Sequence, residues 1–225
     1  LLNMHELYRQ AWGHVAAEQN GEKTSVKLLP PLLGMLKTQY LIAGYSEQGL
    51  DRAFSDDERP PEALLQFNAY RVQSYRQGNN IIEAIARIEP NIAQTQVMLG
   101  DWSLWNGRSK DAWQAYRRAE TELAGEDDAQ VQLQKVFSQP IALPDIPRLA
   151  QLPPAVDTKE ADIVLEFTVD KKGRVQDLER LDDNEESAKQ AKQLMKQVRK
   201  TIFRPRFTNG QPQETEKMVK AFNVQ

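Results

Sequence analysis

The chain has 225 residues, a formal net charge of −3, and hydrophobic and charged fractions of 40% and 27%. This composition is typical of a globular protein with one large or two small cores, and the weak net charge gives no basic field for nucleic acid. The sequence contains no cysteine, which excludes disulfides, thiolate nucleophiles and thiolate metal sites.

The N-terminal part has a helical period of hydrophobicity throughout. His5–Glu18 predicts an amphipathic opening helix, and Leu28–Tyr45 predicts a strongly apolar second helix. Pro61–Arg76 predicts a third helix, which a turn at Gly78–Asn80 separates from a fourth over Ile81–Ile88. We therefore expect helical hairpins in this part of the chain.

The segment after these helices resembles a tetratricopeptide repeat, a helix-turn-helix unit of about 34 residues. The small and apolar residues at the repeat's characteristic offsets are Leu99, Gly100, Gly107, Ala112, Tyr116 and Ala119. The resemblance implies stacked helical hairpins with a concave groove that binds a peptide.

The same resemblance assigns groove positions to the first helix of the repeat. These residues are Gln94, Val97, Asp101, Leu104 and Trp105. The alternative is that Trp102, Trp105 and Trp113 fill the core between the helices. Exposure of Trp105 would favour the groove, and its burial would favour the core.

A proline-rich segment follows the helices and predicts an extended connector without regular structure. It contains Pro140, Pro144, Pro147, Pro153 and Pro154. The sequence thus predicts a helical domain over residues 1–136, a connector over 137–157 and a second domain over 158–225.

The last third of the chain changes from a helical to an alternating pattern. Apolar residues alternate over Ile163–Val169, Asp170–Gly173 supplies a turn, and a second strand follows to about Leu181, which predicts a β-hairpin. The run from Asn184 to Lys200 has acidic residues at its start, basic residues at its end and an apolar stripe, which predicts a helix. The Asn209–Gly210 turn then leads to a last strand over Glu214–Val224.

This order of elements resembles the C-terminal domain of TonB-type energy transducers over roughly Glu160–Val224. The specific motifs are Val169–Val175, the helix end with Phe203 and Pro205, and the Asn209–Gly210 turn at the expected distances. The expected fold is therefore tetratricopeptide-like helical hairpins followed by a small α+β domain, with a three-stranded antiparallel sheet and one main helix.

The last strand is the second candidate binding surface, with Met218, Val219, Lys220 and Phe222 as its candidate contact residues. An edge strand exposes backbone groups to which an extended partner can add. The alternative is that charged residues such as Glu214 and Lys217 block such pairing. A dimer formed through this strand would instead indicate an oligomerisation unit.

Catalytic motifs are missing from the sequence. His5–Glu6 begins like a zinc-protease motif, but Arg9 stands where the second histidine is required. We therefore expect a protein that is not an enzyme and needs no cofactor or metal.

The TonB resemblance implies a periplasmic setting with protein or peptide partners, outer-membrane and other envelope proteins among them. We expect that a signal peptide or membrane anchor preceded the chain, so that any membrane tether would lie in a segment absent from it. The alternatives are an envelope module that binds a small ligand or cell-wall fragment, and a structural oligomerisation unit.

Overall fold

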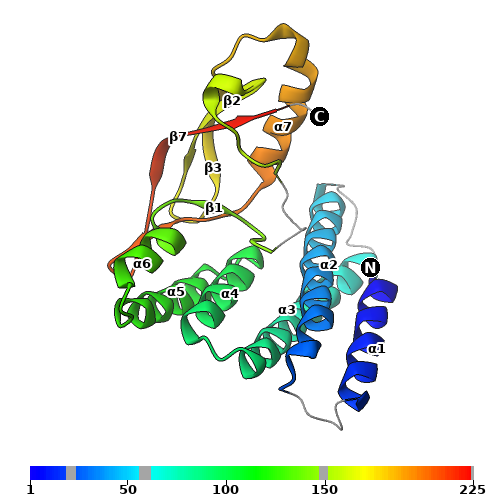
Figure 1. Ribbon diagram of the computed structural model, residues 1–225. Coiled ribbons are helices and arrows are strands. Elements are labelled where there is room, and N and C mark those ends of the chain that lie inside the picture. The colour runs from blue at the N-terminus through cyan, green and yellow to red at the C-terminus, as the bar shows by residue number, and fades with distance from the viewer. Residues whose placement is uncertain (19–23, 56–61, 147–151, 224–225) are drawn as a thin grey trace. The chain divides into compact units, whose positions relative to one another are not determined.

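The computed structural model describes residues 1–18, 24–55, 62–146 and 152–223 (Figure 1). It has an N-terminal helical part and a C-terminal part with small antiparallel sheets, so the predicted order of structural classes is confirmed. Backbone contacts divide the chain into two compact units, Leu1–Asn106 and Gly107–Gln225. The domain limits derived from the proline-rich connector stay a prediction. No helix within the described residues is long and apolar enough to cross a membrane.

In its described residues, 1–18, 24–55 and 62–106, the first unit has four α-helices and a short 3-10 turn. The helices are α1 (Leu2–Glu18), α2 (Leu29–Ser55), α3 (Glu62–Ile88) and α4 (Ile92–Trp105), and the turn η1 (Val26–Leu28) precedes α2. Asn91 caps α4, since its side chain accepts a hydrogen bond from the Gln94 backbone N–H at 2.7 Å.

The predicted turn at Gly78–Asn80 is wrong, because α3 continues through it as one helix. Gly78 is buried, and a Cβ at this position would lie 2.3 Å from the Trp102 ring. The glycine therefore lets the Trp102 indole pack directly on the backbone of α3, where its Nε1 donates to the Tyr75 carbonyl at 3.0 Å. Long-range packing explains this glycine better than a turn does.

The second unit begins with α5 (Ser109–Ala124) and α6 (Ala129–Phe137). Both helices pack against the hairpin of β5 (Arg206–Thr208) and β6 (Gln211–Gln213) through a cluster of aromatic rings. The ring centroids of Tyr116, Phe137 and Phe207 lie 5.6–5.8 Å apart. At the hairpin turn, Arg117 Nε donates to the Gly210 carbonyl at 2.8 Å.

The connector contains a short strand, contrary to the expectation that it lacks regular structure. β1 (Ile141–Ala142) pairs with β4 (Phe203–Arg204), and the Leu143 N–H donates to the Ile202 carbonyl at 2.8 Å. Prolines on either side of a two-residue strand do not interrupt its ladder, since neither paired residue is a proline.

The main sheet of this unit has three antiparallel strands in the order β3-β2-β7. They are β2 (Ile163–Val169), β3 (Val175–Arg180) and β7 (Thr215–Phe222), so the predicted hairpin and last strand are present, with Val224 outside the described residues. The helix α7 (Ala188–Lys200) follows the 3-10 turn η3 (Glu185–Ser187), and its buried stripe completes the core. That core includes Leu165, Phe167, Ala191, Leu194, Val198 and Phe222.

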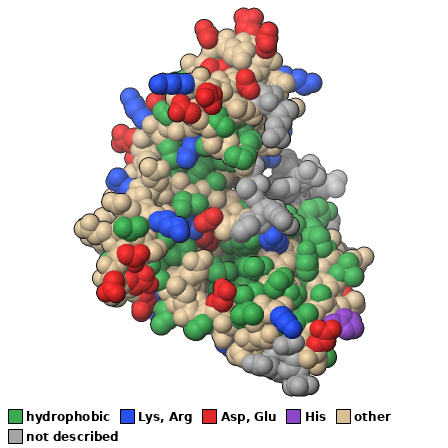
Figure 2. Space-filling model, viewed as in Figure 1, with side chains coloured by type: hydrophobic (Ala, Val, Ile, Leu, Met, Phe, Trp, Pro, Cys, Tyr) green, Lys and Arg blue, Asp and Glu red, His purple; other side chains and the backbone are tan. Residues whose placement is uncertain are grey.

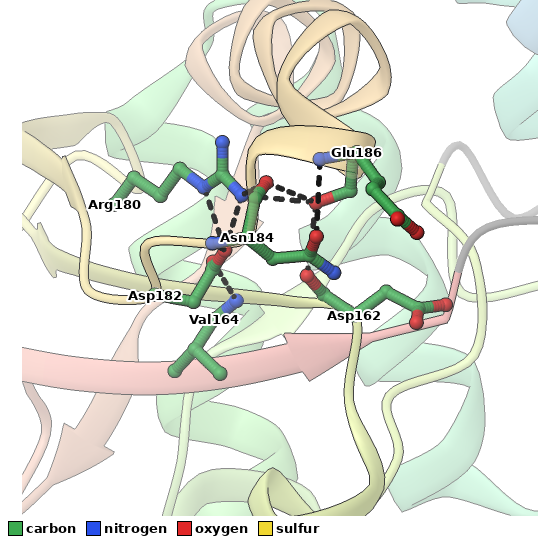
Figure 3. A network of polar contacts seen from close by, with 7 residues as sticks. Asp162, Val164, Arg180, Asp182, Asn184 and Glu186 are labelled. Atoms are coloured by element: carbon green, nitrogen blue, oxygen red, sulfur yellow. Dashed lines mark hydrogen bonds and ion pairs between the residues drawn. The ribbon is translucent and has the colours of Figure 1, made fainter.

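A polar network joins the hairpin to the start of α7 (Figure 3). Arg180 donates from Nε and Nη2 to Asp182, and from Nη2 to the Asn184 carbonyl and to Ser187 Oγ. Asp182 Oδ2 also accepts the Val164 N–H at 2.7 Å. The network therefore fixes both the Arg180 side chain and the segment that leads into α7.

Candidate functional site

The groove residues predicted for the first unit lie on α4, and four of the five are buried. Val97, Asp101, Leu104 and Trp105 are 3–8% exposed, whereas Gln94 is exposed. These four side chains therefore belong to the packed interior of the unit instead of lining an open surface.

Trp105 packs against α2 within an aromatic cluster. Its ring lies 5.5 Å from the Tyr40 ring, and the Trp102 ring lies 4.7 Å from the same tyrosine. Trp105 is 8% exposed, and its Nε1 has no hydrogen-bond partner among the residues that the structure describes. The burial of Trp102 and Trp105 favours the alternative that these two tryptophans fill the helical core. Trp113 does not join them, because it is half-buried and lies 6.4 Å from the Phe207 ring in the second unit.

His5 of the first unit lies beside α2 in a polar contact. Its Nδ1 is 3.0 Å from Thr38 Oγ1 and 3.1 Å from Gln39 Nε2. Burial lowers the pKa of His5 below its ordinary value. Within the described residues, no three His, Asp or Glu side chains come together as metal ligands.

The second predicted surface, the last strand, lies at an edge of the three-stranded sheet. Phe222 is buried in the core and Met218 packs against that core, so these two candidate residues face inward. Val219 is 42% exposed, and Lys220 is half-buried. Val219 is therefore the candidate residue that a partner can reach.

The hydrogen bonds of β2 show which backbone groups of β7 point outward. Val164 directs its N–H to Asp182 and its carbonyl to the Leu181 N–H, both on the β3 side. Val164 and its β7 partner Ala221 therefore form a non-hydrogen-bonded pair. Hydrogen-bonded and non-hydrogen-bonded pairs alternate along antiparallel strands, so the pair of Glu166 and Val219, two positions further on, is also non-hydrogen-bonded. The N–H and carbonyl of Val219 therefore point away from the sheet.

Two features limit this outer edge. The Val156 N–H donates to the Ala221 carbonyl at 2.9 Å, so the chain itself occupies one end. Lys217 has a φ of 50°, and the β2–β7 register shifts between Phe167 and Val169, which marks a bulge. The accessible stretch of β7 is therefore centred on Val219.

A third surface, a groove beside α7, was not predicted from the sequence. Its basic residues are Arg180, Lys192 and Lys196, together with Arg199 and Lys200 at the basic end of the predicted helix. Arg204, which follows this helix in the sequence, does not line the groove: it is 2% exposed and donates to Asp145 Oδ2 at 3.1 Å. The spacing of the lysines places them on one side of the predicted helix, which indicates a basic helix face. The sequence does not indicate that the end of β3 lies beside this face.

No protein-family model, curated protein or solved structure matches the chain. The likeness to TonB-type domains and to tetratricopeptide repeats therefore rests on the sequence motifs, and both identifications stay predictions.

Proposed function

We propose that the protein is a non-enzymatic interaction protein of the periplasm, which binds an extended segment of an envelope protein by strand addition to β7. The observation that carries this proposal is the outward-pointing backbone of Val219 at the sheet edge. Main-chain hydrogen bonds at such an edge supply affinity for an extended partner. The TonB resemblance supports the envelope setting and the class of partner.

The same edge can pair with a second copy of the chain. The exposed Val219 side chain and the short accessible stretch suit either a peptide or an identical strand. An identical strand would make the unit an oligomerisation module, so the experiment has to identify what binds.

The test places a photo-crosslinking amino acid at the neighbouring exposed position Glu216 in the full chain and irradiates it in envelope extract. Mass spectrometry identifies the crosslinked segment. Val219→Pro removes the outward N–H and leaves the ladder to β2 intact, whereas Val219→Thr keeps the N–H and the branched shape. We expect crosslinking to one envelope protein that the proline variant loses and the threonine variant keeps.

Two results would contradict the proposal. Equal crosslinking by both variants would show that the backbone edge is not used. Crosslinks to a second copy of this chain alone would favour the oligomerisation unit.

A further inference from the structure

A groove with a volume of about 610 Å³ lies along one side of α7, next to the last residue of β3. We call it the α7 groove. Its floor includes Ala188, Ala191 and Met195, and the remaining residues that line it are basic. These lining residues of α7 recur every three or four positions, so they form one lateral stripe of the helix.

Five cations surround this apolar floor. They are Arg180, Lys192, Lys196, Arg199 and Lys200. No acidic side chain lines the groove, and the four cations of α7 form no ion pair with any described residue. The groove is therefore electrostatically complementary to an anion that carries several charges.

Arg180 is the cation with a fixed position. Its side chain is 19% exposed and its Nε and Nη2 are held by Asp182, Asn184 and Ser187 (Figure 3). Its Nη1 makes no hydrogen bond within the described part of the chain. A positioned guanidinium binds a carboxylate at lower entropic cost than a mobile one.

The backbone at Arg180 favours an extended ligand. β3 is an edge strand, and the Leu181 N–H donates to the Val164 carbonyl. The pair of Leu165 and Arg180 is then a non-hydrogen-bonded one, so the Arg180 N–H and carbonyl point away from β2. An extended chain in the groove can pair with these groups.

The spacing of the cations fixes the charge pattern of that ligand. Lys192 and Lys196 are separated along the helix by about 6 Å, and Lys196 and Lys200 by the same distance, at about 1.5 Å rise per residue. Alternate side chains of an extended peptide are about 6.6 Å apart on one face. Carboxylates at every second position would therefore match successive cations.

From these observations we propose that the α7 groove binds an extended acidic peptide segment with carboxylates at alternating positions. A flat anionic surface such as a membrane fits less well, because acidic residues lie where the chain enters α7. Figure 2 shows acidic side chains at that end of the unit, and Asp183, Glu185 and Glu186 of the entering segment are exposed. A single peptide can lie on the helix side without approaching these carboxylates.

This proposal goes beyond the binding at β7, since the α7 groove is beside β3, at the opposite edge of the sheet. Either proposal can fail without the other. Val219→Pro, which blocks β7, should leave binding at the α7 groove unchanged.

The experiment measures binding of a fluorescently labelled seven-residue peptide to the full chain by anisotropy. The peptide has glutamate at its second, fourth and sixth positions and threonine elsewhere, and the matched peptide has glutamine in place of glutamate. The groove variant is Lys192→Gln with Lys196→Gln. The control variant, Lys172→Gln with Lys189→Gln, loses the same charge at exposed positions outside the groove.

We expect the groove variant to bind the acidic peptide about tenfold more weakly, because each exposed ion pair contributes modestly. The control variant should keep its affinity, the glutamine peptide should bind at least tenfold more weakly, and the Arg180 amide should become protected from hydrogen exchange. Equal weakening in both variants would overturn the proposal, as would binding of phosphatidylglycerol vesicles without binding of the peptide.

Discussion

Gly173 and Phe203 are in direct backbone contact in the second unit. The Phe203 N–H donates to the Gly173 carbonyl at 2.8 Å, and a Cβ on Gly173 would lie 1.9 Å from the Phe203 carbonyl oxygen. Gly173 also has a φ of +76°, which L side chains rarely adopt. The turn of the hairpin and the strand after α7 are therefore joined at a position that only glycine fits.

Gly173→Ala should destabilise the second unit by roughly 2–4 kcal/mol, because it adds backbone strain to a steric clash. Native-state hydrogen exchange measured by mass spectrometry would detect the loss as faster exchange of β2 and α7. Gly125→Ala is the matched control, since its φ is −90° and its Cβ would make an ordinary contact at 3.5 Å with the Glu122 carbonyl. If the two substitutions had similar effects, the close contact between Gly173 and Phe203 would contribute little to the stability of the unit.

Gly78→Ala should destabilise the first unit by about 1–3 kcal/mol through overpacking. The added methyl would meet the Trp102 ring, and Trp102 is fully buried and stacked on Tyr75 with 6.4 Å between ring centroids. The ring therefore has no free space into which it can move. Urea unfolding followed by tryptophan fluorescence measures the change.

Gly13→Ala serves as the comparison for that measurement. Gly13 lies in α1 with nothing within 4 Å of the new Cβ, so the change should be neutral or stabilising by up to about 1 kcal/mol. A stable Gly78→Ala protein would mean that the close approach of Trp102 to α3 is not required.

The elements of the second unit could be predicted where the signal is local. Asp170 Oδ1 accepts the N–H groups of both Lys172 and Arg174 at 2.8 Å, so the turn is determined by the residues within it. The Asn209–Gly210 turn is likewise local, with φ values of 53° and 72° that these two residue types tolerate.

Features that depend on distant residues could not be predicted in the same way. The sequence around Gly78 has the composition of a turn, and only the packing of Trp102 explains the continuous helix. The burial of Trp105 depends in the same way on Tyr40. The α7 groove requires Arg180 at the end of a neighbouring strand, and the helical pattern alone does not reveal this neighbour.

Asp182→Asn should destabilise the second unit by about 1–3 kcal/mol at neutral pH, because Arg180 loses a charged partner in a largely buried network. The hydrogen bonds from Arg180 lower the pKa of Asp182 to about 2. The folded-state pKa therefore lies below the unfolded value of about 3.9, so the carboxylate's contribution is present above pH ~4 and is lost as pH falls toward 2.

Thermal unfolding between pH 7 and pH 2.5 measures this contribution. The wild-type protein should lose stability below pH ~4 more steeply than Asp182→Asn does. Asp183→Asn, at the next and exposed position, should retain the steep wild-type profile. If the stability of the wild type and of Asp182→Asn fell equally steeply with pH, ionisation of Asp182 would not contribute to the stability of the folded unit.

The attachment of α1 should weaken as pH falls below about 6.5. None of the α1 side chains is fully buried, and His5 joins this helix to α2 through its contacts with Thr38 and Gln39. Burial lowers the pKa of His5, which means that the detached helix binds a proton more readily than the docked one. Docking is therefore strongest above the unfolded pKa of ~6.5 and weakens progressively toward the lower pKa of the docked state.

Hydrogen exchange of α1 at pH 7.5 and 5.5, corrected for intrinsic exchange rates, tests this pH dependence. We expect lower protection of α1 at pH 5.5, with the protection of α4 unchanged. His5→Gln keeps a polar side chain that cannot be protonated, so its α1 should show the same protection at both pH values. His14→Gln alters an exposed histidine of the same helix and should behave like the wild type. If His5→Gln retained the wild-type pH dependence, protonation of another group would have to control the docking of α1.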